Sequence, residues 1–369
     1  MRTMSPLLTR FGGVAAAVTF LSACSGNMQS QVAPSTATSA GVTSYATNAA
    51  KGVLSPWAFR GPLPAVKPDR KKSWISPDGK KAGNANLYVS NFGTADVTIY
   101  TYKKNGLNTA LTGTLTGFTE PAVPCADSAG NVFIPDYGTG KIYEYAYGAT
   151  TPSQILTDPN GGPVSCSVDP STGNLAVSEF APSAANGTVS FYTHATGSPT
   201  TVTVSNIPHP AFVGYTPTGA LYVDGLDSSS SFAIAVAPSG STAFSPVTVT
   251  DGVTMYTPGA IVWGGSYLLV GDQTYQNNPT SAIYQLCTCG TAATLTYKGQ
   301  APIAGSSDVI GFWKRGQQKG TTARFIAPDF GNAANGVMID NPFTQQITAN
   351  ITDSVSQPVG ATISQKGNL

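Results

Sequence analysis

Charged residues are scarce in this chain. Only 10% of the 369 residues are Asp, Glu, Lys or Arg, against roughly a quarter in an average soluble protein. The net charge is +1, so the chain lacks the basic footprint of a nucleic-acid-binding protein and we expect no such partner. Two histidines are present, and no G-x-S-x-G, H-E-x-x-H or G-x-x-x-x-G-K motif occurs. The usual signatures of serine hydrolases, zinc proteases and phosphate-binding loops are therefore missing.

Long hydrophobic runs are also lacking. The apolar run 11–21 is too short to cross a bilayer as a helix. Arg2 and Arg10 precede this run, and a positive start followed by a short apolar run predicts an export signal. Its end, Leu21-Ser22-Ala23-Cys24, resembles the bacterial lipobox. That resemblance implies a signal peptide over residues 1–24, lipid attachment to Cys24 and a membrane contact through the lipid. Ser25 stands where inner-membrane lipoproteins tend to carry Asp, which favours the outer membrane or cell surface.

A small, polar segment follows the signal. Residues 25–73 predict a flexible tether and linker, because they bury too little apolar surface to offset the entropy of ordering. The linker ends in a basic run, "VKPDRKK", which either touches anionic lipid headgroups or is simply solvated; the second interpretation is the simpler one. Residues 74–369 are left for one large domain.

Glycine and proline are abundant, with 40 and 27 residues, and they punctuate a repeat of short strands. The stretch from Glu120, "EPAVPCADSAGNVFIPDYGTGKIYEYAYG", predicts three strands separated by turns, and "SQILTD" supplies a fourth. Similar units recur at about 40–50 residues, the blade period of a β-propeller. We expect an all-β, six-bladed propeller of four-stranded antiparallel blades, as a monomer.

The two ends of the domain complement each other. "NLYVSNFG" at 86–93 matches a second strand and has no clear first strand before it, whereas "PVGATIS" at 358–364 matches first strands such as "GPVSCSV". The C-terminal segment is therefore predicted to join the N-terminal blade and close the ring, which leaves no open sheet edge there. The alternative first strand is "SWISPDG" at 73–79.

The pattern D-x-x-G-N followed by an apolar strand, as in "DSAGNVFIPD", resembles NHL-repeat and gluconolactonase-like six-bladed propellers. The chain also resembles a group of bacterial propeller lipoproteins through "LYVSN", "PVSCSVDP" and "GSSDV". The gluconolactonase resemblance implies a divalent metal held by Glu, Asn and Asp near the channel. The fold alone does not imply an activity, because propellers host many.

One polar position recurs at the end of the predicted second strands. Carboxylates in an arc around a channel can bind a cation or basic ligand, whereas the alternative is that each side chain caps its own turn. His209 lies in a predicted loop on the same face. The candidate ligand-face or metal residues are Asn91, Asp136, Glu179, Asp224, Asp272, Asp329 and His209.

Five cysteines occur. With Cys24 lipidated, the even remainder in an oxidising compartment permits two disulfides. Cys125 and Cys166 occupy one register in neighbouring first strands, so a bridge between two blades is favoured over two buried thiols. Cys287 and Cys289 form a C-x-C pair, for which a strained small-ring disulfide is the candidate.

These features favour a lipid-anchored binding module over an enzyme. We expect no catalytic residues and no required cofactor. The partner is a protein, a small molecule or a carbohydrate on the loop face. The alternative function is a metal-dependent hydrolase, lactonase-like, or a lyase, using Ca²⁺ or Zn²⁺ bound by the acidic residues.

Overall fold

The computed structural model describes residues 72–103, 106–180, 186–273, 281–288, 293–303, 309–314, 325–330, 337–341 and 346–366. Contacts divide the chain into Met1–Ala33 and Pro34–Leu369, and every described strand belongs to the second unit. The predicted signal peptide, Cys24 and the tether up to residue 71 lie outside the described residues. Among the described residues, no helix has the length and apolarity needed to cross a membrane.

Strands form six sheets within the described residues, and each sheet is named here by its second strand. Four sheets contain four strands. The β6 sheet contains β5 (Cys125–Ala126), β6 (Val132–Asp136), β7 (Lys141–Tyr145) and β8 (Gln154–Thr157). The β10 sheet contains β9 (Pro163–Val168), β10 (Leu175–Glu179), β11 (Thr188–Tyr192) and β12 (Thr200–Thr203), with the 3-10 turn η2 (Thr193–Ala195) before β12. The β14 sheet contains β13 (His209–Tyr215), β14 (Leu221–Leu226), β15 (Phe232–Ala237) and β16 (Ser245–Pro246). The β23 sheet contains β22 (Trp313–Lys314), β23 (Phe325–Pro328), β24 (Val337–Asn341) and β25 (Gln346–Ile351).

The other two sheets contain five strands each. The β2 sheet has the order β1-β4-β3-β2-β26. Its strands are β1 (Trp74–Ile75), β2 (Ala85–Asn91), β3 (Asp96–Lys103), β4 (Gly106–Leu115) and β26 (Pro358–Gln365), and a one-turn helix, α2 (Pro77–Lys80), follows β1. The β19 sheet has the order β17-β21-β20-β19-β18. Its strands are β17 (Thr248–Thr250), β18 (Pro258–Trp263), β19 (Leu268–Asp272), β20 (Ala282–Cys287) and β21 (Thr294–Pro302).

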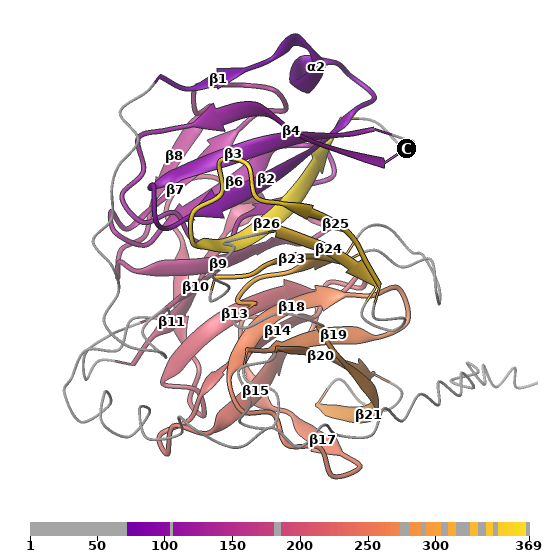
Figure 1. Cartoon of the computed structure of the whole chain (residues 1–369). Coiled ribbons are helices and arrows are strands. Elements are labelled where there is room, and N and C mark those ends of the chain that lie inside the picture. Colours follow the sequence, from indigo (N-terminus) through magenta and orange to yellow (C-terminus); the bar gives the residue numbers. More distant parts are fainter. Residues whose placement is uncertain are drawn as a thin grey trace, which may run out of the picture. The chain divides into compact units, whose positions relative to one another are not determined.

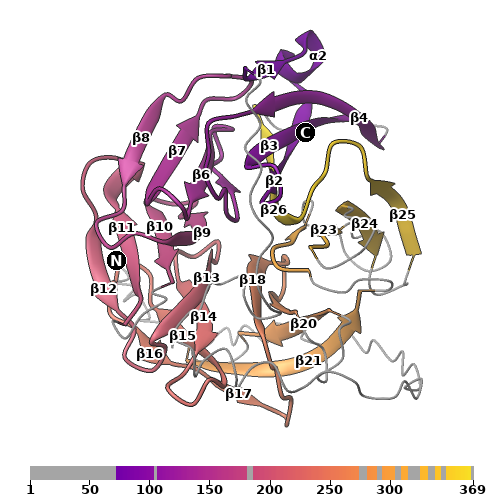
Figure 2. The same ribbon diagram turned by 60° about the vertical axis from the view of Figure 1, so that its left-hand side comes forward.

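The second strands are covered on both faces. All seven residues of β2 are buried, as are all five of β6, β10 and β19. Sheets that stack face to face bury both sides of a strand, so the sequence shows apolar runs such as "LLVGD" rather than strict alternation. Figure 2 shows the sheets arranged around a common axis, with β26, β9, β13 and β18 towards its middle.

The turns between first and second strands explain the D-x-x-G-N pattern. Asp127 Oδ1 accepts the backbone N–H of Asn131 at 2.8 Å, and Gly130 adopts φ 88° within this turn. In the β10 sheet the corresponding turn is one residue longer: Asp169 Oδ1 accepts the N–H of Ser171 at 2.9 Å, and Gly173 has φ 72°. Glycine adopts this left-handed conformation without the Cβ clash that other residues meet. The pattern thus reports a hairpin turn.

The C-terminal strand joins the N-terminal sheet as predicted. β26 pairs antiparallel with β2 over the register Ala85↔Gln365 to Asn91↔Pro358 (Figure 1). The alternative segment takes a different place, because β1 pairs with β4 at the opposite, outer edge of the same sheet. Ile75 is buried there while Trp74 is 42% exposed.

One outer strand differs from its expected place. From its place in the repeat, the stretch "SPVTVT" is expected to form the fourth strand of one blade, but it is shared between two sheets. Ser245 and Pro246 pair with β15. Thr248–Thr250 then run parallel to β21 at the outer edge of the next sheet. Proline cannot donate to a strand ladder, and Pro246 stands where the chain leaves one sheet for the other.

Neighbouring first strands are joined by covalent and polar links. The predicted disulfide is confirmed: Cys125 and Cys166 are bonded, with Cα atoms 5.5 Å apart, and they connect β5 to β9. Val123 donates its N–H to Val164 O at 2.9 Å, and Ala260 donates to Ile310 O at 3.1 Å. Cys287 is also disulfide-bonded; Cys289 lies outside the described residues.

Candidate functional site

The recurring polar position lies at the same register in the sheets, opposite a residue at or shortly before the start of each first strand, or one residue into it. In five sheets that opposing residue is a proline, which suits the first position of a strand because it lacks an N–H. The pairs are Asn91↔Pro358, Asp136↔Pro121, Glu179↔Pro163, Gly225↔Pro210, Asp272↔Pro258 and Asp329↔Val309.

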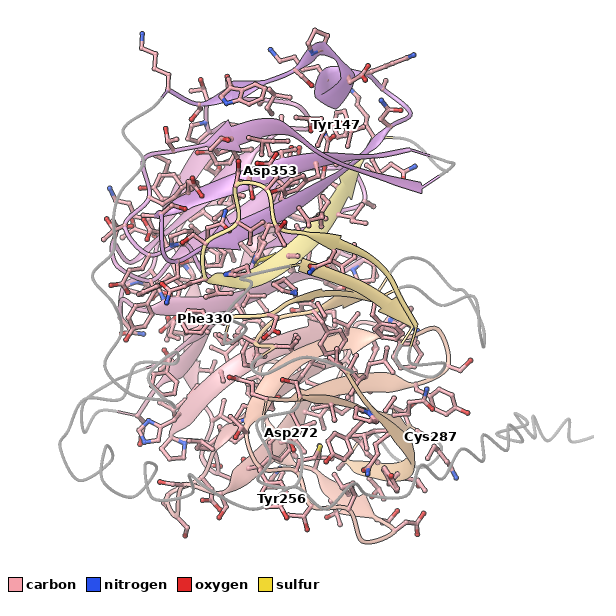
Figure 3. All side chains as sticks on the ribbon, viewed as in Figure 1. Tyr147, Tyr256, Asp272, Cys287, Phe330 and Asp353 are labelled. Carbon is pink, nitrogen blue, oxygen red and sulfur yellow. A yellow bond between two sulfur atoms is a disulfide. The ribbon has the colours of Figure 1, made fainter. Side chains whose placement is uncertain are left out.

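Asp136 and Asp272 perform the same task in two sheets. Asp136 accepts the backbone N–H of Glu120 at 2.7 Å and that of Thr119 at 3.0 Å. Asp272 accepts the N–H groups of Tyr256 and Thr257, both at 3.0 Å (Figure 3). Both carboxylates are fully buried. Each one fixes the loop that enters the first strand of its own sheet.

Asn91 repeats this arrangement with an amide. Its Oδ1 accepts the N–H of Ser356, 265 residues away, at 3.2 Å. Its Nδ2 donates to Asp96 Oδ1 at 2.9 Å and to Thr98 Oγ1 at 3.0 Å. The side chain therefore links the entry loop of β26 to the turn between β2 and β3. For Asn91, Asp136 and Asp272, the capping alternative raised by the sequence describes the contacts that are present.

Glu179 has different partners. Its carboxylate accepts hydrogen bonds from Thr188 Oγ1 and Ser190 Oγ, and Asn160 Nδ2 donates to Oε2 at 2.9 Å. Asp158, in the loop before β9, interacts with the same carboxylate. Three donors thus surround the carboxylate of Glu179, which lies next to a second buried carboxyl group.

Asp158 is 4% exposed. Its Oδ1 accepts the N–H of Asn160 at 3.0 Å, but its Oδ2 has no hydrogen-bond donor among the described residues. Burial, followed by the charge of Glu179, raises the pKa of Asp158 to about 8. Two carboxyl groups in contact cannot both ionise without a large cost, so the pair holds one proton at neutral pH.

The β14 sheet departs from the pattern. Gly225 occupies the register position, and a Cβ on it would lie 2.2 Å from His209 O. The preceding Asp224 is fully buried and accepts the N–H of Phe212 at 3.1 Å. Its Oδ2 has no hydrogen-bond partner among the described residues. Burial raises the pKa of Asp224 well above its usual range, and the charge of Asp272 adds to this effect.

Asp329 and His209 complete the candidate set. Asp329 is fully buried and its backbone forms a bridge with Val309. His209 begins β13, is half-buried, and its ring lies 5.6 Å from that of Phe180. The Nδ1 atom of His209 is buried and has no hydrogen-bond partner among the described residues.

The structure does not gather these residues into one cluster. Among the residues described, no three His, Cys, Asp or Glu side chains lie close enough to hold a metal ion. Asp224 and Asp272 interact electrostatically, whereas Asp136 holds the entry loop of its own sheet and Glu179 interacts with Asp158. The largest cluster of buried residues is apolar and includes first-strand or adjoining residues such as Val123, Val164, Phe212, Ile310 and Val359.

Two features were not anticipated from the sequence. Asp158 and Asn160 belong to the turn-rich stretch "DPNGG", whose composition indicates a loop but not a carboxyl partner. A small cavity of about 150 Å³ is also lined in part by the turn that precedes β10 and by the turn that precedes β16. Tyr192, Tyr215, Asp169 and Ser241 are among its lining residues.

No protein-family model matches the chain, and no curated protein matches it. Among solved structures, the chain is similar to one titled "Crystal structure of Nidogen/Laminin Complex". The TM-score is 0.59 at 12% identity, over 77% of this chain and 100% of that one. Identity at this level reports the fold and not the activity. The chain is an all-β protein with the β-propeller fold and four-stranded antiparallel blades.

Proposed function

We propose that the chain is a lipid-anchored β-propeller of the bacterial cell envelope that acts as an interaction module. In this proposal the six sheets are six blades of one ring, as in NHL-repeat propellers, and β26 closes the ring. Pairing of β26 with β2 supports the closure. The contacts of β26 with β5 and β22, and of β5 with β9, support the blade order. The lipobox at Cys24 supports the anchor.

The observation that carries the binding role is the way the entry loops are held. Buried Asn91, Asp136 and Asp272 each fix the backbone of the loop that leads into a first strand. These loops share a face with the turns after the second strands. A preorganised loop face binds with less loss of conformational freedom. Rigid loops on a sheet scaffold are therefore suited to recognition.

The face can be tested by site-specific crosslinking in cells. In one variant a photoreactive residue replaces Thr119, which is exposed in the entry loop of the β6 sheet. In a second variant it replaces Ser239, which is exposed in the turn between β15 and β16, at the end of the β14 sheet that lies away from its entry loop. We expect an adduct of defined mass from position 119 and none from position 239. Adducts from position 239 alone, or from neither position, would contradict binding through this face.

The metal-dependent hydrolase is the second candidate, and the contact between the buried carboxyl groups Asp158 and Glu179 favours it. Carboxylate and amide oxygens are ligands that Ca²⁺ accepts. Metal content of the purified chain separates the two functions. One Ca²⁺ or Zn²⁺ per chain, lost in both Asp136→Asn and Glu179→Gln, would support the hydrolase. Purified chain without bound metal supports the interaction module.

A further inference from the structure

The first described residues are fixed to the outer edge of the β2 sheet. β1 pairs with β4, and Ser76 donates its N–H to Thr112 O at 2.8 Å. Asn86 Nδ2 donates to Gly79 O at 2.6 Å. The Tyr147 hydroxyl contacts Lys81 O at 3.0 Å, which attaches this segment to the next sheet as well. β1 and α2 therefore form a fixed part of the rim (Figures 1 and 3).

This segment exposes an indole and, near it in the sequence, three basic side chains. Trp74 is 42% exposed, and the other large hydrophobic side chain exposed to a similar degree in the described residues is Ile155 at 49%. Side chains alternate along β1, so burial of Ile75 directs Trp74 outwards. Lys72, Lys80 and Lys81 are exposed within seven residues of it in the chain.

Positive charge is concentrated in this part of the sequence. Residues 67–81 contain six basic and two acidic residues, in a chain whose net charge is +1. Many of the remaining carboxylates are buried, including those of Asp136, Asp224 and Asp272. Within the described part of this segment, Lys72, Lys80 and Lys81 are exposed together with one acidic residue, Asp78, so the described segment carries an excess of exposed positive charge.

We propose that Lys72, Trp74, Lys80 and Lys81, called here the basic rim, rest on a bilayer that contains anionic phospholipids. Tryptophan favours the bilayer interface, where its ring and N–H find an apolar and a wet environment. Each lysine near an anionic surface contributes roughly a fivefold increase in partitioning. The basic rim directly follows residue 71, so the segment that carries Cys24 enters the propeller at this edge.

The proposal extends the lipid-anchored module by stating which edge meets the membrane, and it rests on the proposed function only for its setting. The full processed protein is floated with phosphatidylcholine vesicles, with and without phosphatidylglycerol. The rim variant carries Lys72→Gln, Lys80→Gln and Lys81→Gln, and a second variant carries Trp74→Ser. Matched controls are the triple variant Lys141→Gln, Lys298→Gln and Lys366→Gln, whose three lysines are exposed elsewhere, and Ile155→Ser.

We expect anionic vesicles to bind the wild type more tightly than neutral ones. The rim variant should lose most of this preference, roughly fivefold per lysine at low salt, and added salt should weaken it in the wild type. Trp74→Ser should weaken binding to both vesicles more than Ile155→Ser does. Equal losses in the rim variant and the lysine control, or no preference for anionic vesicles, would overturn the proposal.

The same experiment keeps the two proposals apart. Binding to neutral vesicles that persists in Trp74→Ser reports the lipid on Cys24, because the lysines of the basic rim have no charge partner there. If the protein does not bind neutral vesicles but binds anionic ones through the basic rim, the lipid anchor is refuted and the role of the basic rim is supported. A protein that binds both vesicles equally, with every variant unchanged, supports the anchor and refutes the role of the basic rim.

Discussion

Replacing Asp158 by Asn should remove a large pH dependence of stability. The pKa of Asp158 rises from 3.8 to about 8 in the folded protein. In the unfolded chain the side chain is solvated and ionises near its usual value. Between these two values the folded state binds a proton that the unfolded state has released. The free energy of unfolding therefore falls as pH rises through this range.

The magnitude follows from the shift. Each unit corresponds to about 1.4 kcal/mol, so a shift of roughly four units gives up to about 6 kcal/mol, and relaxation around the pair reduces this to about 3–6 kcal/mol. Asn cannot ionise, and its amide donates to Glu179 as the acid proton does. We expect Asp158→Asn to be close to the wild type at about pH 4 and several kcal/mol more stable at about pH 8.

Urea unfolding followed by tryptophan fluorescence at several pH values measures this difference. Asp224 also has a raised pKa, so the wild type alone mixes several groups. The difference between wild type and Asp158→Asn isolates one of them. Parallel pH profiles for the two proteins would refute the shared proton, and so would a variant that is less stable at every pH.

Three further predictions concern stability. Cys125→Ser with Cys166→Ser should lower the free energy of unfolding by about 2–4 kcal/mol, because the bridge closes a loop of 41 residues. Under reducing conditions, which open the disulfide of Cys287 in both proteins, wild type and variant should match in chemical denaturation. An unchanged midpoint of the variant under oxidising conditions would contradict the prediction. Asp136→Ala should lower the free energy of unfolding by about 2–4 kcal/mol, because it leaves two backbone N–H groups unpaired, and the thermal midpoint should fall accordingly. A loss of less than about 1 kcal/mol in the free energy of unfolding would contradict this and mean that water replaces the carboxylate as acceptor. Gly360→Ala should destabilise the protein, since the added Cβ would lie 2.8 Å from Val123 Cα. In the control variant Gly83→Ala, the added Cβ meets no atom within 4 Å, and the substitution costs only the strain of the left-handed backbone. Equal thermal midpoints for the two variants would argue against close packing of β26 at Val123.

The strands and the C-terminal pairing were predictable because both follow from local patterns. The D-x-x-G-N turn marks each hairpin where it occurs, and "PVGATIS" repeats the pattern of a first strand. The bridge between Cys125 and Cys166 followed from register, since equivalent positions on neighbouring first strands lie close together.

The rest depended on contacts that no period encodes. β17 pairs parallel with a strand 45 residues later, and nothing in "SPVTVT" indicates which sheet it joins. "SWISPDG" was placed only as an alternative inner strand, whereas Trp74 and Ile75 lie at the outer edge. The recurring polar side chains at the ends of the second strands could be recognised from the sequence. Their partners, such as Asp158 for Glu179, come from loops whose conformation the sequence leaves open.

The pairing of β2 with β26 also bears on the order in which the protein is made. β2 leaves the ribosome long before its partner, since Asn91 and Ser356, which are joined by a hydrogen bond, lie 265 positions apart. Until then, β2 has an unpaired edge, which is prone to incorrect pairing, and contacts of such separation form slowly. A chain that is cut short before Pro358 lacks the strand that covers this edge. The native state is thereby reserved for chains that have been synthesised through β26, and incomplete copies stay exposed to proteases and chaperones.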